Sequence, residues 1–164
     1  MAVYDGVTHS RLKAISLEAD VVSVSLLSAT TTPFAVTAAA HNGKVIVLNK
    51  ADGLVVTLPA ATGSGAHFRF SVGTQVTSNT YVIKVADSTD VMSGSLFVVD
   101  QSNGTGTQFG TLAASDTITM TGLTTGGIAG GLITLIDVGP NLYAVHGTVI
   151  GTGIEATPFS ATVS

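Results

Sequence analysis

Ionic side chains are scarce in this sequence of 164 residues. Only 10% of the residues are charged and 45% are hydrophobic, whereas charged residues make up about 25% of ordinary soluble domains. So few charges cannot cover the surface of a free monomer, although Ser and Thr can also coat a β-protein without charge. We therefore expect much of the surface to lie against other protein, in an obligate assembly.

Cysteine and tryptophan are absent. Without cysteine there are no disulfides and no zinc sites with thiolate ligands, and the redox compartment is left undetermined. The net charge is -4, and the six Lys and Arg residues are scattered along the chain. They form no basic stripe that could hold a phosphate backbone, so we expect no direct binding to nucleic acid.

Long uncharged windows do occur, over residues 21–40 and 117–136. Length alone would admit either window as a membrane span. The first contains several Ser and Thr residues and Pro33, and the second contains the pairs Gly126-Gly127 and Gly130-Gly131. This content is typical of strands and turns, so we expect no membrane segment.

The stretch from Gly43 to Pro59 has the clearest pattern in the sequence. Two apolar, β-branched runs, 45–48 and 54–58, flank a polar segment that ends in Asp52-Gly53. Gly53 is free to adopt a positive φ, and Pro59 cannot donate a hydrogen bond to a ladder. The pattern predicts a β-hairpin whose two strands are covered on both faces.

From residue 34 onward, extended segments recur at the intervals typical of an all-β sandwich or barrel. Turn residues separate several of them, as in Ser78-Asn79, Asn103–Gly106 and Gly139-Pro140-Asn141. We expect a single β-sandwich domain over residues 34–150, with no second helical pattern. The expected strands are 35–39, 44–49, 54–58, 66–72, 80–86, 95–100, 107–112, 117–121, 132–137 and 141–149.

The two ends of the chain differ from this domain. Residues 1–33 are expected to form an N-terminal arm, with a short helix or extended segment near residues 11–20 and a half-buried strand over 21–27. Residues 151–164 are expected to form a short C-terminal tail. Thr32-Pro33-Phe34 and Thr157-Pro158-Phe159 repeat one another; this is either chance in a Thr-rich chain or a sign that both ends dock in similar pockets, on the same or adjacent subunits.

No motif in the sequence carries chemistry. Gly63-Ser64-Gly65 lacks the strand-to-helix setting of a nucleophile elbow, and the four His residues are spread singly. Asp87-Ser88-Thr89-Asp90 lacks the further ligands of a calcium loop, so we expect a loop with solvated carboxylates. Residues 124–131 lack the Lys of a phosphate-binding loop and are expected to form a mobile turn. We therefore predict no catalytic residue, no cofactor and no metal site.

Three stretches resemble small structural proteins of tailed bacteriophages that decorate or cement the capsid. They are HNGKVIVLNKADG (41–53), TLPAATGSG (57–65) and GTGIEATPF (151–159). The resemblance covers most of residues 36–162 and implies a compact β-sandwich or jelly-roll-like domain, usually trimeric. It also implies a position on the outer surface of the head shell, where major capsid proteins meet; the N-terminal thirty residues match least.

A cement protein works by adding buried area across the joints between shell subunits and needs no chemistry. We therefore predict a virion structural protein, not an enzyme, whose partners are its own copies and the major capsid protein. Apolar side chains of the arm and tail are expected to contact neighbouring chains: Leu12, Ile15, Leu17, Val22, Val24, Phe34 and Phe159.

Two alternatives remain open at the sequence level. One is a fibre or host-surface adhesion module of the virion, which would bind glycans in a pocket lined by Tyr4, Tyr81 or Tyr143. The other is a hydrolase, which would need His67, His146, Asp87 and Asp137 to lie close together.

Overall fold

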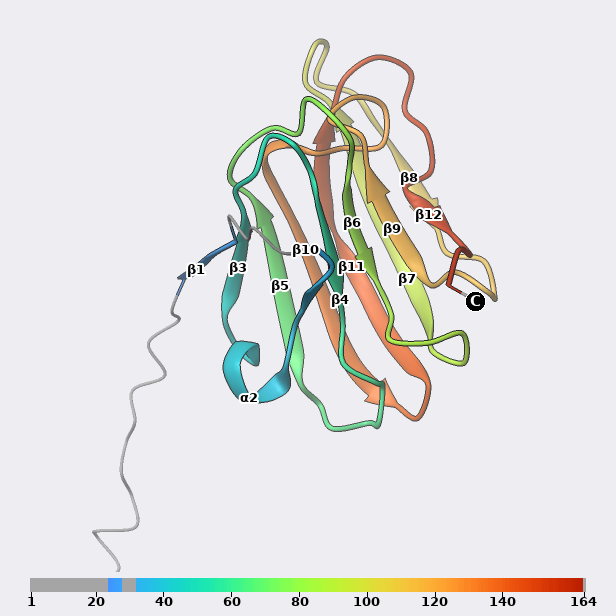
Figure 1. The fold of residues 1–164 in the computed structure, drawn as a ribbon. Coiled ribbons are helices and arrows are strands. Elements are labelled where there is room, and N and C mark those ends of the chain that lie inside the picture. Colours follow the sequence, from blue (N-terminus) through green and yellow to red (C-terminus); the bar gives the residue numbers. More distant parts are fainter. Residues whose placement is uncertain (1–23, 28–31, 164) are drawn as a thin grey trace, which may run out of the picture.

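Nearly all regular structure in the computed structural model is β-strand, within residues 24–27 and 32–163, which it describes. The strands form two open sheets that lie face to face (Figure 1). The prediction of an all-β fold is confirmed.

The larger sheet contains seven strands among the described residues, and the smaller contains five. In spatial order, the seven are β1 (Val24–Leu27), β3 (Val45–Leu48), β5 (His67–Val72), β10 (Ile128–Gly139), β11 (Leu142–Gly151), β7 (Val91–Asp100) and β8 (Gly106–Gly110). The five are β12 (Phe159–Ser160), β9 (Thr117–Met120), β6 (Tyr81–Lys84), β4 (Leu54–Thr57) and β2 (Phe34–Ala35).

The predicted hairpin over Gly43–Pro59 is wrong, because β3 belongs to the seven-stranded sheet and β4 to the five-stranded sheet. The turn itself is present: the N–H of Gly53 donates to the carbonyl oxygen of Lys50 at 3.0 Å. Its function differs, since it carries the chain from one layer to the other. In each strand buried residues alternate with half-buried ones, so only one face is fully covered.

From β1 to β6 the chain alternates between the two sheets, and each strand pairs in parallel with the strand two before it. The first half of the fold is thus a flattened coil. Later strands break this pattern, because the β10–β11 hairpin lies between β5 and β7. Of the ten pairings among the described strands, five are parallel. A jelly roll is built from antiparallel Greek keys, and that connectivity is not confirmed.

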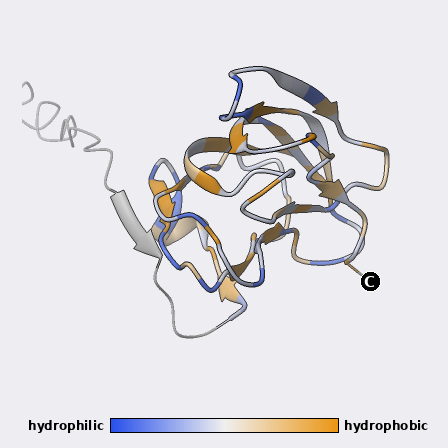
Figure 2. Cartoon of the chain, turned by 90° about the horizontal axis from the view of Figure 1, so that it is seen from above, coloured by the Kyte–Doolittle hydropathy of each residue, from blue (hydrophilic) through white to orange (hydrophobic). Residues whose placement is uncertain are grey.

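The core lies between the two sheets, which Figure 2 views from above. Burial alternates along β5 and β6, because successive side chains of a strand point to opposite faces. The predicted turns at Asn79 and Asn141 are also present, with φ of 56° and 60°. The largest fully buried side chains are Tyr81, Tyr143, Phe68, Phe70, Ile46, Leu48, Leu58, Ile83, Met92, Leu96, Ile118 and Met120.

Only Ala35 of the strand expected over 35–39 lies in a strand, and a short helix begins at Ala38. It is α2 (Ala38–His41), and the hydroxyl of its N-cap residue Thr37 accepts a 3.3 Å hydrogen bond from the N–H of Ala40. Three successive alanines have the highest helix propensity, and Thr is a favourable N-cap. A single turn is too short to show a helical period in the sequence.

Both ends of the described chain contribute edge strands. β1, within the expected arm, is one edge of the seven-stranded sheet, and β12, within the expected tail, is one edge of the five-stranded sheet. The opposite edge of the five-stranded sheet is β2. The repeated Thr-Pro-Phe segments therefore occupy the two opposite edges of one sheet, where Phe34 and Phe159 pack against the core of their own chain.

Candidate functional site

The face of the seven-stranded sheet that points away from the core carries two rows of side chains in register. In one row Leu132 lies opposite Thr148, which in turn lies opposite Phe97. Phe97 is 41% exposed and Leu132 is 43% exposed. We call the eight residues of these two rows the outer face: Ser71, Leu132, Thr148 and Phe97 in the first, and Arg69, Thr134, His146 and Ser95 in the second.

The outer face contains no acidic side chain. The acidic residues of the strands that form it, Asp100 and Asp137, occupy buried positions. Of the seven acidic residues in the described part of the chain, four are buried, namely Asp90, Asp100, Asp116 and Asp137. The described part of the chain therefore buries more than half of its carboxylates. The outer face is a broad surface of apolar, hydroxyl and basic groups.

The buried carboxylate of Asp137 is held by the loop between β4 and β5. It accepts hydrogen bonds from the N–H groups of Thr62, Gly63 and Ser64, and also from the hydroxyls of Thr62 and Ser64. Successive N–H groups that point to one centre form an anion-binding concavity. Here the anion is a side chain of the same protein, so the loop 61–65 is a structural anchor.

The Asp137 anchor changes the ionisation of its neighbourhood. Burial alone would raise the pKa of Asp137, but the hydrogen bonds from Ser64, Gly63 and Thr62 outweigh it and lower the pKa to about 2. Asp90 accepts only the N–H of Ala61 in the same loop, at 3.1 Å; burial, with the nearby charges of Asp87 and Asp137, raises its pKa. Burial and these two buried acids also raise the pKa of Tyr143.

The prediction that residues 87–90 form a loop with solvated carboxylates is wrong for Asp90. Asp87 is exposed and accepts hydrogen bonds from Thr89, but Asp90 is only 1% exposed. The expected mobile turn over 124–131 is also corrected in its second half, because β10 begins at Ile128.

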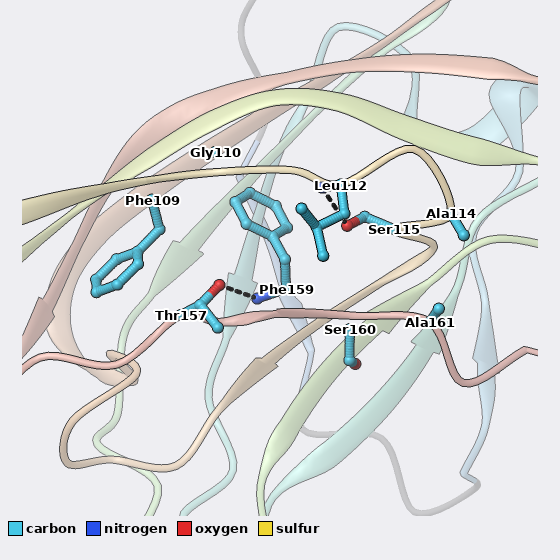
Figure 3. A pocket seen from close by; sticks show the side chains of 9 residues that line it. All are labelled: Phe109, Gly110, Leu112, Ala114, Ser115, Thr157, Phe159, Ser160 and Ala161. Atoms are coloured by element: carbon cyan, nitrogen blue, oxygen red, sulfur yellow. Dashed lines mark hydrogen bonds between the residues drawn. The ribbon is translucent and has the colours of Figure 1, made fainter.

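An apolar cavity of about 320 Å³ lies at the edge of the molecule where β8 and β12 meet, and we call it the edge pocket (Figure 3). The side chains of Phe109 and Phe159 form part of its wall, and Leu112, which is 80% exposed, forms another part. The full lining is Phe109, Gly110, Leu112, Ala114, Ser115, Thr157, Phe159, Ser160 and Ala161.

Two hydroxyls of the edge pocket are bonded to its own walls. The hydroxyl of Thr157 accepts from the N–H of Phe159 at 3.2 Å, and that of Ser115 accepts from the N–H of Leu112 at 2.9 Å. Sites for small polar molecules position a few polar groups toward the ligand. These two hydroxyls stabilise the pocket wall, and most of the remaining lining is apolar, which favours an apolar side chain as the occupant.

The predicted interface residues fall into three groups. Leu12, Ile15, Leu17 and Val22 lie outside the described residues. Val24 begins the edge strand β1. Phe34 is half-buried and stacks edge-on against His41 at 5.7 Å, and Phe159 is 8% exposed in the wall of the edge pocket. Contact of these residues with neighbouring chains stays a prediction.

The pocket expected for a glycan does not form around Tyr81 and Tyr143, which are both fully buried. The hydroxyl of Tyr81 donates to the carbonyl oxygen of Thr74, and that of Tyr143 donates to the carbonyl oxygen of Pro59. Neither ring can stack on a sugar; Tyr4 lies outside the described residues.

The four residues that a hydrolase would need are also separated. His67 and His146 occupy outward positions on β5 and β11, whereas Asp137 occupies a buried position on β10. Asp87 lies on an exposed loop. Within the described residues, no three His, Cys, Asp or Glu side chains are grouped as metal ligands.

The outer face was not predicted from the sequence, which placed the interface in the arm and tail. The signal was available at alternate positions of β7 and β10, where apolar residues occur on both faces of the strand.

No family model, curated protein or solved structure matches the chain. Among the described residues, no helix has the length and apolar character needed to cross a membrane.

Proposed function

We propose that this chain is a structural protein of a bacteriophage particle that decorates the outer surface of the capsid as a homo-oligomer, with three copies expected. It binds major capsid proteins where they meet and strengthens the joints between them. The sequence resemblance motivates the capsid as partner and the trimer as oligomer. The observation that carries an assembly role is the outer face, an exposed surface that includes Phe97 and Leu132 and has no acidic group.

Charge supports a protein partner for the outer face. Interface cores are depleted in charged residues and enriched in apolar and aromatic ones. Arg69 and His146 are the only ionisable side chains among the eight residues of the outer face. Both are basic, so a shell surface with apolar groups and some acidic groups would complement them.

The mechanism requires only buried area. A protein that binds the assembled shell, and not its separated subunits, stabilises the assembly by the free energy of binding. A stable protein–protein interface buries about 1,600 Å² in total. Each bound copy would therefore add contacts that must break before neighbouring shell subunits can separate.

The test is binding to heads of the phage that encodes the chain, prepared without this protein. Purified protein is added to the heads, and bound protein is measured by co-sedimentation and by cryo-electron microscopy. We expect additional density on the outer surface, with the seven-stranded sheet toward the shell. Phe97→Asp combined with Leu132→Asp should weaken binding at least tenfold, because two acids would enter an interface that has none.

Ile154→Asp is the matched control, since Ile154 is 89% exposed and lies off the outer face. It should bind as the unaltered protein does. Circular dichroism must show that all variants are folded. Absence of binding by the unaltered protein, or full binding by the folded double variant, would contradict the proposal.

A further inference from the structure

We infer that the edge pocket receives an apolar side chain from the N-terminal segment, residues 1–23, of a second copy of this chain. This inference rests on the proposed homo-oligomer and adds how its copies are joined. It identifies β8 and β12 as the receiving side of the contact, and Leu12, Ile15 or Leu17 as the inserted residue.

The edge pocket has the properties of a receptor for an apolar side chain. Two Phe side chains and Leu112 line it, and its volume of about 320 Å³ exceeds that of a single Leu or Ile. It lies between two edge strands, because β8 ends the seven-stranded sheet and β12 ends the five-stranded sheet. An uncovered apolar cavity at an open edge of two sheets is a place where another chain can add contacts.

The sequence before β1 supplies a matching occupant. Residues 11–20 read RLKAISLEAD, in which Leu12, Ile15 and Leu17 are large and apolar. The described core is built from residues 36–159. No other stretch outside the described residues is long enough to reach a distant site, since the remaining ones are 28–31 and residue 164.

For Leu17, chain reach favours a neighbour over the same molecule. β1 and β8 are the opposite edges of the seven-stranded sheet, so six strand spacings of about 4.8 Å separate them by about 29 Å. The seven Cα-to-Cα steps from Leu17 to Val24 span at most about 25 Å when fully extended. The Leu17 backbone therefore falls short of its own edge pocket, and only the earlier residues could reach it by crossing the whole sheet.

A contact between opposite edges is heterologous, and heterologous contacts close into rings when the rotation permits. If successive sandwiches are joined edge to edge around an axis perpendicular to their sheets, all outer faces point in the same direction. Such a ring presents every outer face to one shell. The inference is thereby compatible with the surface proposed above for capsid binding.

The absence of native cysteine makes disulfide cross-linking a clean test. One version of the full chain carries Leu112→Cys, and a second version, with a different tag, carries Leu12→Cys, Ile15→Cys or Leu17→Cys. The two versions are co-expressed and oxidised, and mixed dimers are scored on a non-reducing gel. We expect a mixed dimer for at least one arm position. Replacing Leu112→Cys by Ile154→Cys, outside the pocket, should reduce its yield at least tenfold.

A second measurement uses no cross-link. Leu112→Asp places a charge in the pocket wall at a position that is 80% exposed, so folding should be preserved. Light scattering should show at least tenfold weaker self-association, whereas Ile154→Asp should associate normally. The inference is overturned if the unaltered protein is monomeric or if no arm position gives a mixed dimer. Binding to heads is scored separately, so either proposal can fail alone.

Discussion

The backbone N–H of Gly63 donates a 2.6 Å hydrogen bond to Oδ1 of Asp137, 74 residues further along the chain. Together with the bonds from Thr62 and Ser64, it fastens the loop after β4 to the end of β10. The same loop also meets Asp90 and the hydroxyl of Tyr143. One short loop thus connects the coiled first half of the fold to the hairpin that follows it.

Asp137→Asn should destabilise the protein by about 3 kcal/mol, because hydrogen bonds to a charged acceptor are lost and an amide NH₂ would face N–H donors. Asp90→Asn should change stability by less than about 1 kcal/mol. Its amide oxygen can still accept from Ala61, and a buried charge is removed. Urea unfolding at pH 6 measures both. Equal losses for the two variants would show that Asp137 has no special role.

The loss of stability at acid pH should reflect the protonation of Asp137. Its pKa of about 2 in the folded protein is below the ordinary Asp value of about 3.9, so the unfolded chain takes up the proton first as the pH falls. The stabilisation is complete above about pH 4 and is lost between about pH 4 and pH 2. The difference in unfolding free energy between the unaltered protein and Asp137→Asn should therefore shrink over this range. The contribution of Asp90 to stability has the opposite pH dependence. Because its pKa is raised in the folded protein, this contribution becomes more favourable as the pH falls.

Fold class and most strand positions could be predicted from the sequence, because alternation along a strand is a local property. β5 and β6 bury alternate residues along strands that were expected over 66–72 and 80–86. The partner of each strand could not be predicted in the same way. A turn such as Asn49–Gly53 can lead back along the same sheet or across to another one, and the two apolar runs look alike in both cases.

The candidate surfaces were harder to predict than the strands. The stretch TLPAATGSG is conspicuous in the sequence, but its role depends on Asp137, which topology brings to it from far along the chain. The outer face likewise arises only when Leu132, Thr148 and Phe97 come into register on three strands. Sequence spacing holds no information on such pairings.

Gly122→Ala and Gly104→Ala form a matched pair, because both glycines have a positive φ, of 79° and 74°. A Cβ at Gly122 would lie 1.9 Å from the carbonyl oxygen of Val76, whereas a Cβ at Gly104 meets nothing within 4 Å. Gly104→Ala should cost about 1 kcal/mol from backbone strain alone. Gly122→Ala should cost well over 3 kcal/mol or prevent folding. Thermal unfolding compares them, and similar melting temperatures would contradict the described path of residues 121–127.

The carboxylate of Asp116 should hold the last described residues, Thr162 and Val163, in place. Its carboxylate accepts from the N–H of Thr162 at 2.9 Å and from that of Val163 at 3.1 Å. Asp116→Ala removes both acceptors, while Phe159 stays paired with Ile118. The amides of Thr162 and Val163 should then exchange with solvent about tenfold faster, since a lost bond to a charged group is worth about 1.5 kcal/mol.

Residue-resolved hydrogen exchange by NMR gives this comparison, and Asp87→Ala is the control. Asp87 bonds only locally to Thr89 among the contacts described above, so its loss should leave the exchange of Thr162 and Val163 unchanged. If Asp116→Ala altered those two amides by less than twofold, other contacts would hold the tail. If it also accelerated exchange at Phe159, the edge strand β12 and the wall of the edge pocket would depend on Asp116, and the variant should then lose self-association as Leu112→Asp does.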